Sequence, residues 1–342
     1  MIKRIFRRLG FLLAGIIFLL IILGGAWYQS DIPVKELEPK YFTSESSYID
    51  VMDSKLHVRQ RGAGPAIFLI HGSFASLHTW SGWEDTLSKT YRTISMDLPA
   101  HGLTGPNPSH RYSTDDYEKI VIALADALRI DTFFVAGNSM GGNIAWKMAL
   151  HHPDRIKRLV LVDAAGFGRL TSDSAKSPKR SDPFIFKLLR SELTGNLLTR
   201  ITPRFLVEWN MRQVYGDPSK VKSADVDRFY ELMLREGNRK ATVDRLRMPG
   251  QDLKDSIQYI NVPTLILWGQ KDQWIPVEHA YRFQKSIQHS ILRVFPSAGH
   301  IPMEEIPQES VEVALAFFNS KLKGISKILP LTTSSLPTVR QA

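Results

Sequence analysis

The sequence predicts an α/β fold in which helices cover both faces of a mostly parallel sheet, with an all-helical segment inserted into it. Three observations lead to this prediction. Short, continuously apolar runs recur along the chain, and such runs are typical of strands buried on both faces. Helix-like segments separate the runs, which favours parallel strands joined by crossover helices. The runs stop between residues 167 and 256 and then resume, which indicates an insertion.

The predicted elements follow one another in a regular order. A β-hairpin is expected around Asp53 and Ser54, where the apolar alternation reverses. The buried strands after it are expected at 66–70, 93–96, 133–136, 158–163, 262–268 and 291–295. Helices of the sheet domain are expected at 78–89, 112–128 and 309–321. Helices of the insertion are expected at 184–192, 203–215, 223–236 and 239–246.

These elements define the domain organisation. Residues 48–166 and 257–322 form one core domain, and 167–256 form a helical cap inserted into it. The polar segment 29–47 contains two prolines and no periodicity, so we expect a linker. The tail 323–342 is rich in Ser, Thr and Pro and is expected to be disordered.

Composition excludes several classes of function. The 342-residue chain has no cysteine, which excludes disulfides, a thiolate nucleophile and cysteine-ligated metals. Its net charge is +10, with the excess in the first eight residues and in 167–255. For 167–255 we favour solvated helix surface over attraction to anionic lipid. The chain shows no interleaving of arginine with aromatic residues and no zinc-ligand spacing, so we predict no nucleic acid partner, no metal and no cofactor.

The N-terminus predicts a membrane anchor. Four cations lie within the first eight residues, and no charge follows from Phe11 to Tyr28. At ~1.5 Å per residue this run nearly spans the hydrocarbon core of a bilayer. We favour an uncleaved signal anchor at 1–28 over a cleaved signal peptide, because Gly24-Gly25-Ala26 is a poor cleavage site. The positive-inside rule then places the N-terminus in the cytoplasm and the catalytic domain on the outer, periplasmic or extracellular, side.

The stretch Gly137-Asn138-Ser139-Met140-Gly141 carries the main chemical prediction. It lies between an apolar, β-prone run and a helix-prone run, as Gly-x-Ser-x-Gly does in a sharp strand-to-helix turn. Such a turn strains the central residue and exposes the serine Oγ above the sheet. Small residues two positions before and after the serine avoid a clash across the turn. Ser139 is therefore the predicted nucleophile.

A serine nucleophile needs a base and an orienting carboxylate, and both are expected at the carboxyl ends of strands. Asp272 follows the strand at 262–268, and His300 follows the last strand in a loop that contains Gly299. The order Ser, Asp, His fits this prediction. Asp163 also ends a strand, so it stays a rival to Asp272 as the acid.

The negatively charged oxygen of an acyl-transfer intermediate needs two N–H donors that are already in place. One is predicted to be Met140, the residue after the nucleophile. The other should come from the loop after residue 70, where Gly72 permits a close approach. We assign Ser73, with Phe74 as the alternative.

Several motifs together resemble the α/β-hydrolase superfamily, in particular its esterase, lipase and epoxide-hydrolase-like branch with a helical cap. The motifs are His71-Gly72, Asp97-Leu98-Pro99, Gly137-Asn138-Ser139-Met140-Gly141-Gly142, Gly269-x-x-Asp272 and Gly299-His300. The resemblance covers about 48–322. It implies that Ser139, Asp272 and His300 form the triad and that Ser73 and Met140 supply the oxyanion donors. Ala100 departs from the glycine usual in the Asp-x-Pro-Gly-x-Gly turn.

The motifs and the resemblance lead to a functional prediction. We expect a membrane-anchored serine hydrolase that cleaves small-molecule or lipid-like carboxylic esters through an acyl-enzyme. Five cap aromatics would enclose an apolar acyl pocket or, equally well, form the core of the cap, so no substrate contacts are assigned to them: Phe184, Phe186, Phe205, Trp209 and Tyr215.

Two alternatives stay open. Carbon–carbon hydrolases of ring-cleavage products share Gly-Asn-Ser-Met-Gly-Gly, but they usually carry another glycine-rich oxyanion loop and an aromatic soon after the histidine. A non-catalytic scaffold would usually lack a triad member. A serine at the nucleophile position argues against dehalogenases and epoxide hydrolases of this superfamily, which use aspartate there.

Overall fold

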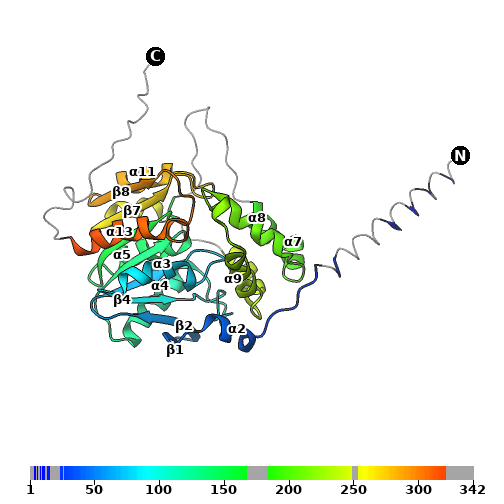
Figure 1. The fold of residues 1–342 in the computed structure, drawn as a ribbon, viewed down its shortest axis with the longest axis horizontal. Helices are drawn as coiled ribbons and strands as arrows, with labels where there is room; N and C mark the ends of the chain where they lie inside the picture. The colour runs from blue at the N-terminus through cyan, green and yellow to red at the C-terminus, as the bar shows by residue number, and fades with distance from the viewer. Residues whose placement is uncertain are drawn as a thin grey trace, which may run out of the picture.

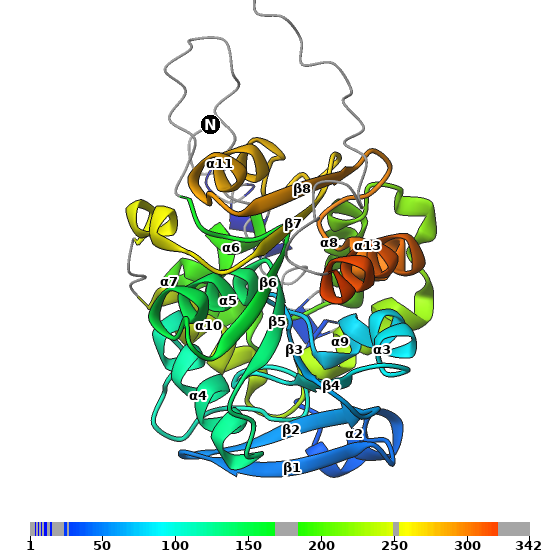
Figure 2. The ribbon, with the colours of Figure 1, turned by 90° about the vertical axis from the view of Figure 1, so that its left-hand side faces the viewer.

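The computed structural model describes residues 27–167, 184–248 and 253–320, together with isolated residues before position 26. A twisted eight-stranded sheet lies at the centre, and helices pack on both of its faces (Figures 1 and 2). The strand order is β1-β2-β4-β3-β5-β6-β7-β8. Strands β1 and β2 form an antiparallel hairpin, β2 pairs antiparallel with β4, and all later pairs are parallel. The predicted fold class is confirmed.

The strands lie where the apolar runs predict them. Their bounds are β1 Ser46–Val51, β2 Ser54–Arg61, β3 Ala66–Ile70, β4 Arg92–Met96, β5 Phe133–Asn138, β6 Ile156–Val162, β7 Thr264–Gly269 and β8 Ser290–Phe295. All five residues of β3 are buried, because the strand lies inside the sheet with helices on both sides. Burying each large aliphatic side chain stabilises the fold by about 1.5–3 kcal/mol.

Helices from the two sides form two apolar layers against the sheet. One layer contains α4 (Thr114–Ala127), α5 (Met140–His151) and α11 (Glu278–Ser286). The other contains α3 (Ser81–Leu87) and α13 (Pro307–Asn319). Helix α4 begins with a capping box: the Ser113 hydroxyl accepts from the Asp116 N–H at 3.1 Å, and the Asp116 carboxylate accepts from the Ser113 N–H at 3.1 Å.

The insertion between β6 and β7 is helical in its described part. It contains α6 (Phe184–Arg190), α7 (Glu192–Leu198), α8 (Arg204–Val214), α9 (Ser223–Leu234) and α10 (Asn238–Arg247). Four of these match the predicted helical segments. The fifth, α7, is separated from α6 by Ser191 alone and was not predicted, because the segment expected at 184–192 ends at its first residue. The short η3 (Lys254–Tyr259) leads back to β7.

The segment before the hairpin differs from the prediction of a linker. Residues 29–47 contain helix α2 (Val34–Tyr41), whose Leu37 side chain is buried beside Leu103 and Leu232. Two backbone bonds, from Ile32 to Leu234 and from Glu236 to Ile32, tie the residues before α2 to the end of α9. This contact between distant parts of the chain has no local sequence signal, so the polar composition was misleading.

The predicted membrane anchor is not supported. In the part of the chain that the structure describes, no helix is both long enough and apolar enough to cross a membrane. This finding contradicts the expected single-pass anchor and the localisation derived from it, and we withdraw both. Most of residues 11–26 and all of the predicted tail 323–342 lie outside the described residues.

The turn after β4 explains why the chain tolerates a departure from the family pattern. Ala100 has a φ of 71°, a conformation that favours glycine and accounts for the glycine usual at this position. Asp97 holds the turn together, because its carboxylate accepts from the N–H groups of Leu77 and Leu103 and from His57 Nδ1, each at 2.8 Å. Burial alone would raise the pKa of Asp97, but these interactions with His57 lower it below its usual range. The turn is structural, as predicted.

Candidate active site

Ser139 occupies the sharp turn between β5 and α5. Its φ of 53° and ψ of −117° are unusual for a residue with a side chain, and they direct the backbone from strand to helix without a linker. A Cβ on Gly137 would overlap the carbonyl of Gly141, and a Cβ on Gly141 would overlap the carbonyl of Ile70. The glycines are therefore required by close backbone contacts, as predicted.

His300 and Asp272 meet beside this turn. His300 Nδ1 lies 2.7 Å from Asp272 Oδ2, and both side chains are buried. The other oxygen of Asp272 accepts from the N–H groups of Trp274 at 2.7 Å and Ile275 at 3.0 Å. A carboxylate with these donors holds the imidazole with its proton on Nδ1, which leaves Nε2 free to accept a proton.

The structure separates the two candidate acids. Asp272 is the carboxylate hydrogen-bonded to His300, whereas Asp163 Oδ1 accepts from the N–H of Gly269 at 2.9 Å. Burial, and then the negative charge of Asp272, raise the pKa of Asp163 well above its usual range. Asp163 is therefore not the hydrogen-bonded partner of the imidazole.

Two residues that the sequence analysis did not single out hold the His300 loop in place. Asn138 donates from Nδ2 to the carbonyls of Val162 at 3.1 Å and His300 at 3.0 Å. Glu305, at the end of α12 (Pro302–Glu305), accepts from the N–H of Gly299 at 2.7 Å. Asn138 lies inside the Gly-x-Ser-x-Gly motif, so its position was a possible signal. Glu305 had none.

The two predicted oxyanion donors belong to segments next to Ser139. Met140 begins α5, and the first N–H groups of a helix have no acceptor within the helix. Ser73 lies in the loop after β3, and its Oγ is 3.6 Å from the Met140 sulfur. A Cβ on Gly72 would lie 3.0 Å from Ser139 Cβ, so this loop does approach the nucleophile closely. Phe74 has a φ of 66° and stays the alternative donor.

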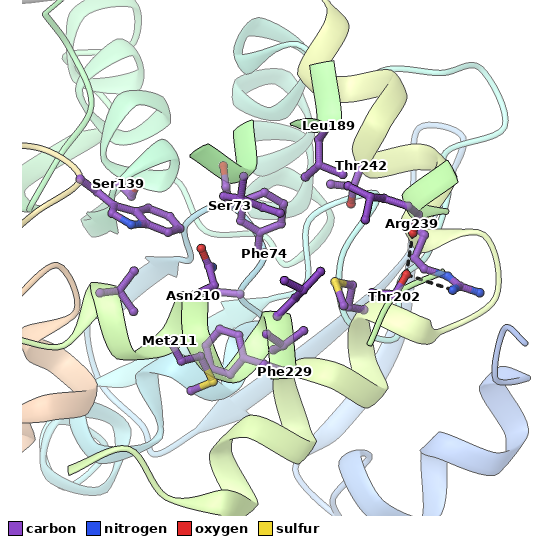
Figure 3. Close-up of a pocket in the computed structure, with 18 of the residues that line it drawn as sticks. Ser73, Phe74, Ser139, Leu189, Thr202, Asn210, Met211, Phe229, Arg239 and Thr242 are labelled. Carbon is purple, nitrogen blue, oxygen red and sulfur yellow. Dashed lines mark hydrogen bonds between the residues drawn. The ribbon is translucent and has the colours of Figure 1, made fainter. Parts of the chain in front are cut away.

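An elongated pocket extends from Ser139 to the cap, with a volume of about 100 Å³. Figure 3 shows Ser139 at one end, Arg239 and Thr202 at the other, and apolar side chains between them. These side chains come mainly from the cap and include Leu189, Leu206, Val207, Met211, Phe229 and Met233.

The aromatics expected to enclose the pocket lie elsewhere, with one partial exception. The side chains of Phe184, Phe205 and Trp209 are exposed, Tyr215 is buried, and none of the four is among the described lining residues. Phe186 packs against Phe74 and Trp274, two residues that do line the pocket, with ring centroids 5.3 and 5.4 Å apart. The prediction failed because helical spacing alone does not show which face of a cap helix points inward.

An ion pair closes the end of the pocket far from Ser139. Arg239 on α10 is buried, and its Nη2 lies 2.6 Å from Asp31 and 2.7 Å from the carbonyl of Gln29. Arg239 Nη1 also donates to Thr202 Oγ1 at 3.2 Å. The positive charge at this end of the pocket is thus already neutralised by a residue of the segment before α2.

Comparison with known proteins agrees with the fold. A curated relative from Comamonas testosteroni, a 2-hydroxy-6-oxo-6-phenylhexa-2,4-dienoate hydrolase, is 26% identical over 80% of this chain and 94% of its own. The solved structure of a meta-cleavage product hydrolase, CumD, is 25% identical with a TM-score of 0.67, over 80% of this chain and 97% of its own.

A third comparison shows likeness of fold alone. The structure of a membrane phospholipase A is 22% identical with a TM-score of 0.67, over 95% of this chain and 99% of its own. The family model described as the alpha/beta hydrolase fold matches residues 65–307, which is most of the described chain. The chain therefore belongs to the alpha/beta hydrolase family.

Proposed function

We propose that this hydrolase uses Ser139 as nucleophile, His300 as base and Asp272 as the orienting acid. The observation that carries the proposal is the buried 2.7 Å contact between His300 and Asp272, at a pocket that Ser139 and His300 both line. This arrangement suits acyl transfer, because it combines a strained, partly exposed serine with a base held in one tautomer.

The reaction would proceed in two halves. His300 Nε2 takes the proton of Ser139 Oγ, which attacks the substrate carbonyl and forms a tetrahedral intermediate. The N–H groups of Met140 and Ser73 stabilise its oxyanion, each by roughly 3–4 kcal/mol. The leaving group departs with the proton from His300, and water activated by the same imidazole then releases the acid from Ser139.

The lining of the pocket favours an ester of an uncharged, apolar acyl group. Among the described lining residues, the charged or titratable side chains are His300, assigned to catalysis, and Arg239, which is paired with Asp31. An acyl chain can be buried against the remaining apolar surface, whereas an anion would meet no uncompensated cation there.

The relatives favour carbon–carbon bond hydrolysis, and they support this alternative better than they support an ester substrate. The Comamonas enzyme and another relative, 28% identical, are both named as hydrolases of 2-hydroxy-6-oxo-dienoates. A dienoate carries a carboxylate, and pairing that group with Arg239 would require Arg239 to exchange Asp31 for the substrate. An uncharged ester would thus leave the ion pair between Arg239 and Asp31 intact, whereas a dienoate bound by Arg239 would break it.

One experiment compares the two reactions in the same preparation. The full chain and a Ser139→Ala variant are assayed with p-nitrophenyl esters of several chain lengths and with 2-hydroxy-6-oxo-6-phenylhexa-2,4-dienoate. Faster turnover of one class by the parent than by the variant assigns the reaction. Labelling of Ser139 by a fluorophosphonate reports the nucleophile independently of substrate choice. A parent that neither turns over a substrate nor is labelled contradicts the proposal and favours a non-catalytic scaffold.

A further inference from the structure

The proposed triad does not use one buried carboxyl group that lies next to it. Asp163 follows β6, between the strand that carries Ser139 and the strand that leads to Asp272. One oxygen of Asp163, one oxygen of Asp272 and one ring nitrogen of His300 lie within 4.8 Å of one another. The side chain of Asp163 is fully buried and its φ is 44°, a strained value for a non-glycine residue.

The hydrogen-bond partners of the two carboxyl groups are unequal. Asp272 accepts three hydrogen bonds, from the N–H groups of Trp274 and Ile275 and from His300 Nδ1. Asp163 accepts one, from the N–H of Gly269, and its Oδ2 is buried without a hydrogen-bond partner in the described part of the chain. A buried oxygen without a partner is costly, unless it carries a proton that it can share with an acceptor nearby.

Electrostatics place that proton on Asp163. Two carboxylates this close in a buried site cannot both ionise, so the pair titrates as a unit. Asp272 has more donors and a cationic partner when His300 is protonated, so it keeps the negative charge. Glu305 faces the pair from α12 and adds further negative potential, and His279 on α11 lies within electrostatic reach of Asp272.

We propose that Asp163 is a positioning residue that donates a carboxyl O–H to Asp272, and that it replaces Asp272 as the partner of His300 when Asp272 is removed. The proposal rests on the triad proposed above. The two carboxyl groups then carry a single negative charge. In the intact site the neutral Asp163 fixes the position of the Asp272 carboxylate. When Asp272 is removed, its negative charge no longer opposes the ionisation of Asp163, so Asp163 can ionise.

The protonation state can be tested without any substrate. Infrared spectra of the parent and of Asp163→Asn are compared at neutral pH. We expect the carbonyl band of a protonated carboxyl group in the parent and its loss in the variant. If Asp163→Asn removes no such band, the proposal is wrong, whatever the activity of the enzyme.

The positioning role is tested by the pH profile of Ser139 labelling with a fluorophosphonate. Asp163→Asn keeps an N–H donor toward Asp272, so we expect a rate within about threefold of the parent and an unchanged acid limb. Asp163→Ala removes the donor and should lower the rate about tenfold or more. If Asp163 were a second anion, Asp163→Asn would instead shift the acid limb to lower pH, which would overturn the proposal.

The replacement role needs a double variant. Removing the acid of a triad typically lowers the rate about 10⁴-fold. We expect Asp272→Asn to retain at least about ten times the labelling rate of Asp272→Asn combined with Asp163→Asn. Equal rates in the single and double variants would show that Asp163 does not take over. Asp154→Asn, an exposed position after α5, is the matched control, and thermal unfolding confirms that every variant is folded.

Discussion

Glu305 provides the sharpest prediction, because one buried carboxylate connects the cap to the loop that carries His300. Its two oxygens accept from the N–H groups of Gly216 at 2.9 Å, Asp217 at 2.8 Å and Gly299 at 2.7 Å. Gly216 and Asp217 follow α8 of the cap, and Gly299 immediately precedes His300. The side chain is 6% exposed, so water cannot readily replace it as the acceptor.

The expected loss of stability follows from these three bonds. Hydrogen bonds to a charged acceptor contribute about 1.5–3 kcal/mol each, but removing the carboxylate also removes its desolvation penalty. We therefore expect Glu305→Ala to lower the free energy of unfolding by about 3–5 kcal/mol. At about 2–4 °C per kcal/mol, Tm should fall by roughly 6–20 °C. Glu305→Gln keeps one acceptor oxygen and should lose about half as much.

Thermal unfolding and the kcat/KM for an ester substrate are the two measurements. Because the His300 loop loses its anchor, kcat/KM should fall by about 10–100-fold at a temperature where the variant is folded. Glu312→Ala, at an exposed position on α13, is the control and should change stability by no more than about 0.5 kcal/mol. A Glu305→Ala protein with the Tm and kcat/KM of this control would refute the reasoning.

Three further predictions concern other parts of the site. Gly72→Ala places a Cβ 2.8 Å from Asn138 Oδ1 and 3.0 Å from Ser139 Cβ, so kcat/KM should fall by about tenfold or more. An unchanged kcat/KM would show that the loop after β3 can shift without disturbing Ser139. Burial, and then the charge of Arg282, lower the pKa of His279 to about 4, so the folded state keeps this imidazole neutral. The free energy of unfolding should therefore be highest above pH ~6.5, the usual pKa of histidine in an unfolded chain, and this group should lower it by about 1 kcal/mol per pH unit toward pH 4. Denaturant titrations of His279→Gln should show a weaker dependence of the free energy of unfolding on pH. Asp31→Asn should lower the free energy of unfolding by only about 1 kcal/mol, because Asp31 is exposed. It should also favour an ester with a terminal carboxylate on its acyl chain, so that the kcat/KM for this ester rises relative to that for the uncharged ester. An equal ratio of the two kcat/KM values in parent and variant would count against Arg239 facing the pocket.

The sequence predicted the features that depend on local spacing. The run of β-prone residues, the small residues around Ser139 and the loops after β7 and β8 are all readable within a few positions, so the strands and the three triad candidates were found. The break in the strand pattern between 167 and 256 likewise predicted the helical insertion. Local spacing could not choose between Asp163 and Asp272, because both follow buried strands; only the hydrogen bond to His300 separates them.

Features that depend on contacts between distant segments were missed. Glu305 has the sequence signature of a helix surface, yet the cap covers it. Residues 29–47 are mostly polar because one side of α2 is exposed, and Leu37 is the buried residue of that helix. The prediction about the cap aromatics was wrong for the same reason. A helix of the insertion has several neighbours, and its sequence does not show which of its faces lines the pocket.

The ion pair between Arg239 and Asp31 has a practical consequence for how the protein is handled. The chain reaches Asp31 through Gln29, whose N–H bonds to the carbonyl of Arg200, so this short stretch is held against the cap from both sides. A tag fused close to it would emerge beside the far end of the substrate channel. Trimming the chain past Asp31 would leave a guanidinium facing the lumen without its counter-ion. Substrate specificities measured on the trimmed and the full-length protein would then differ, because only the full-length protein has Arg239 neutralised by Asp31.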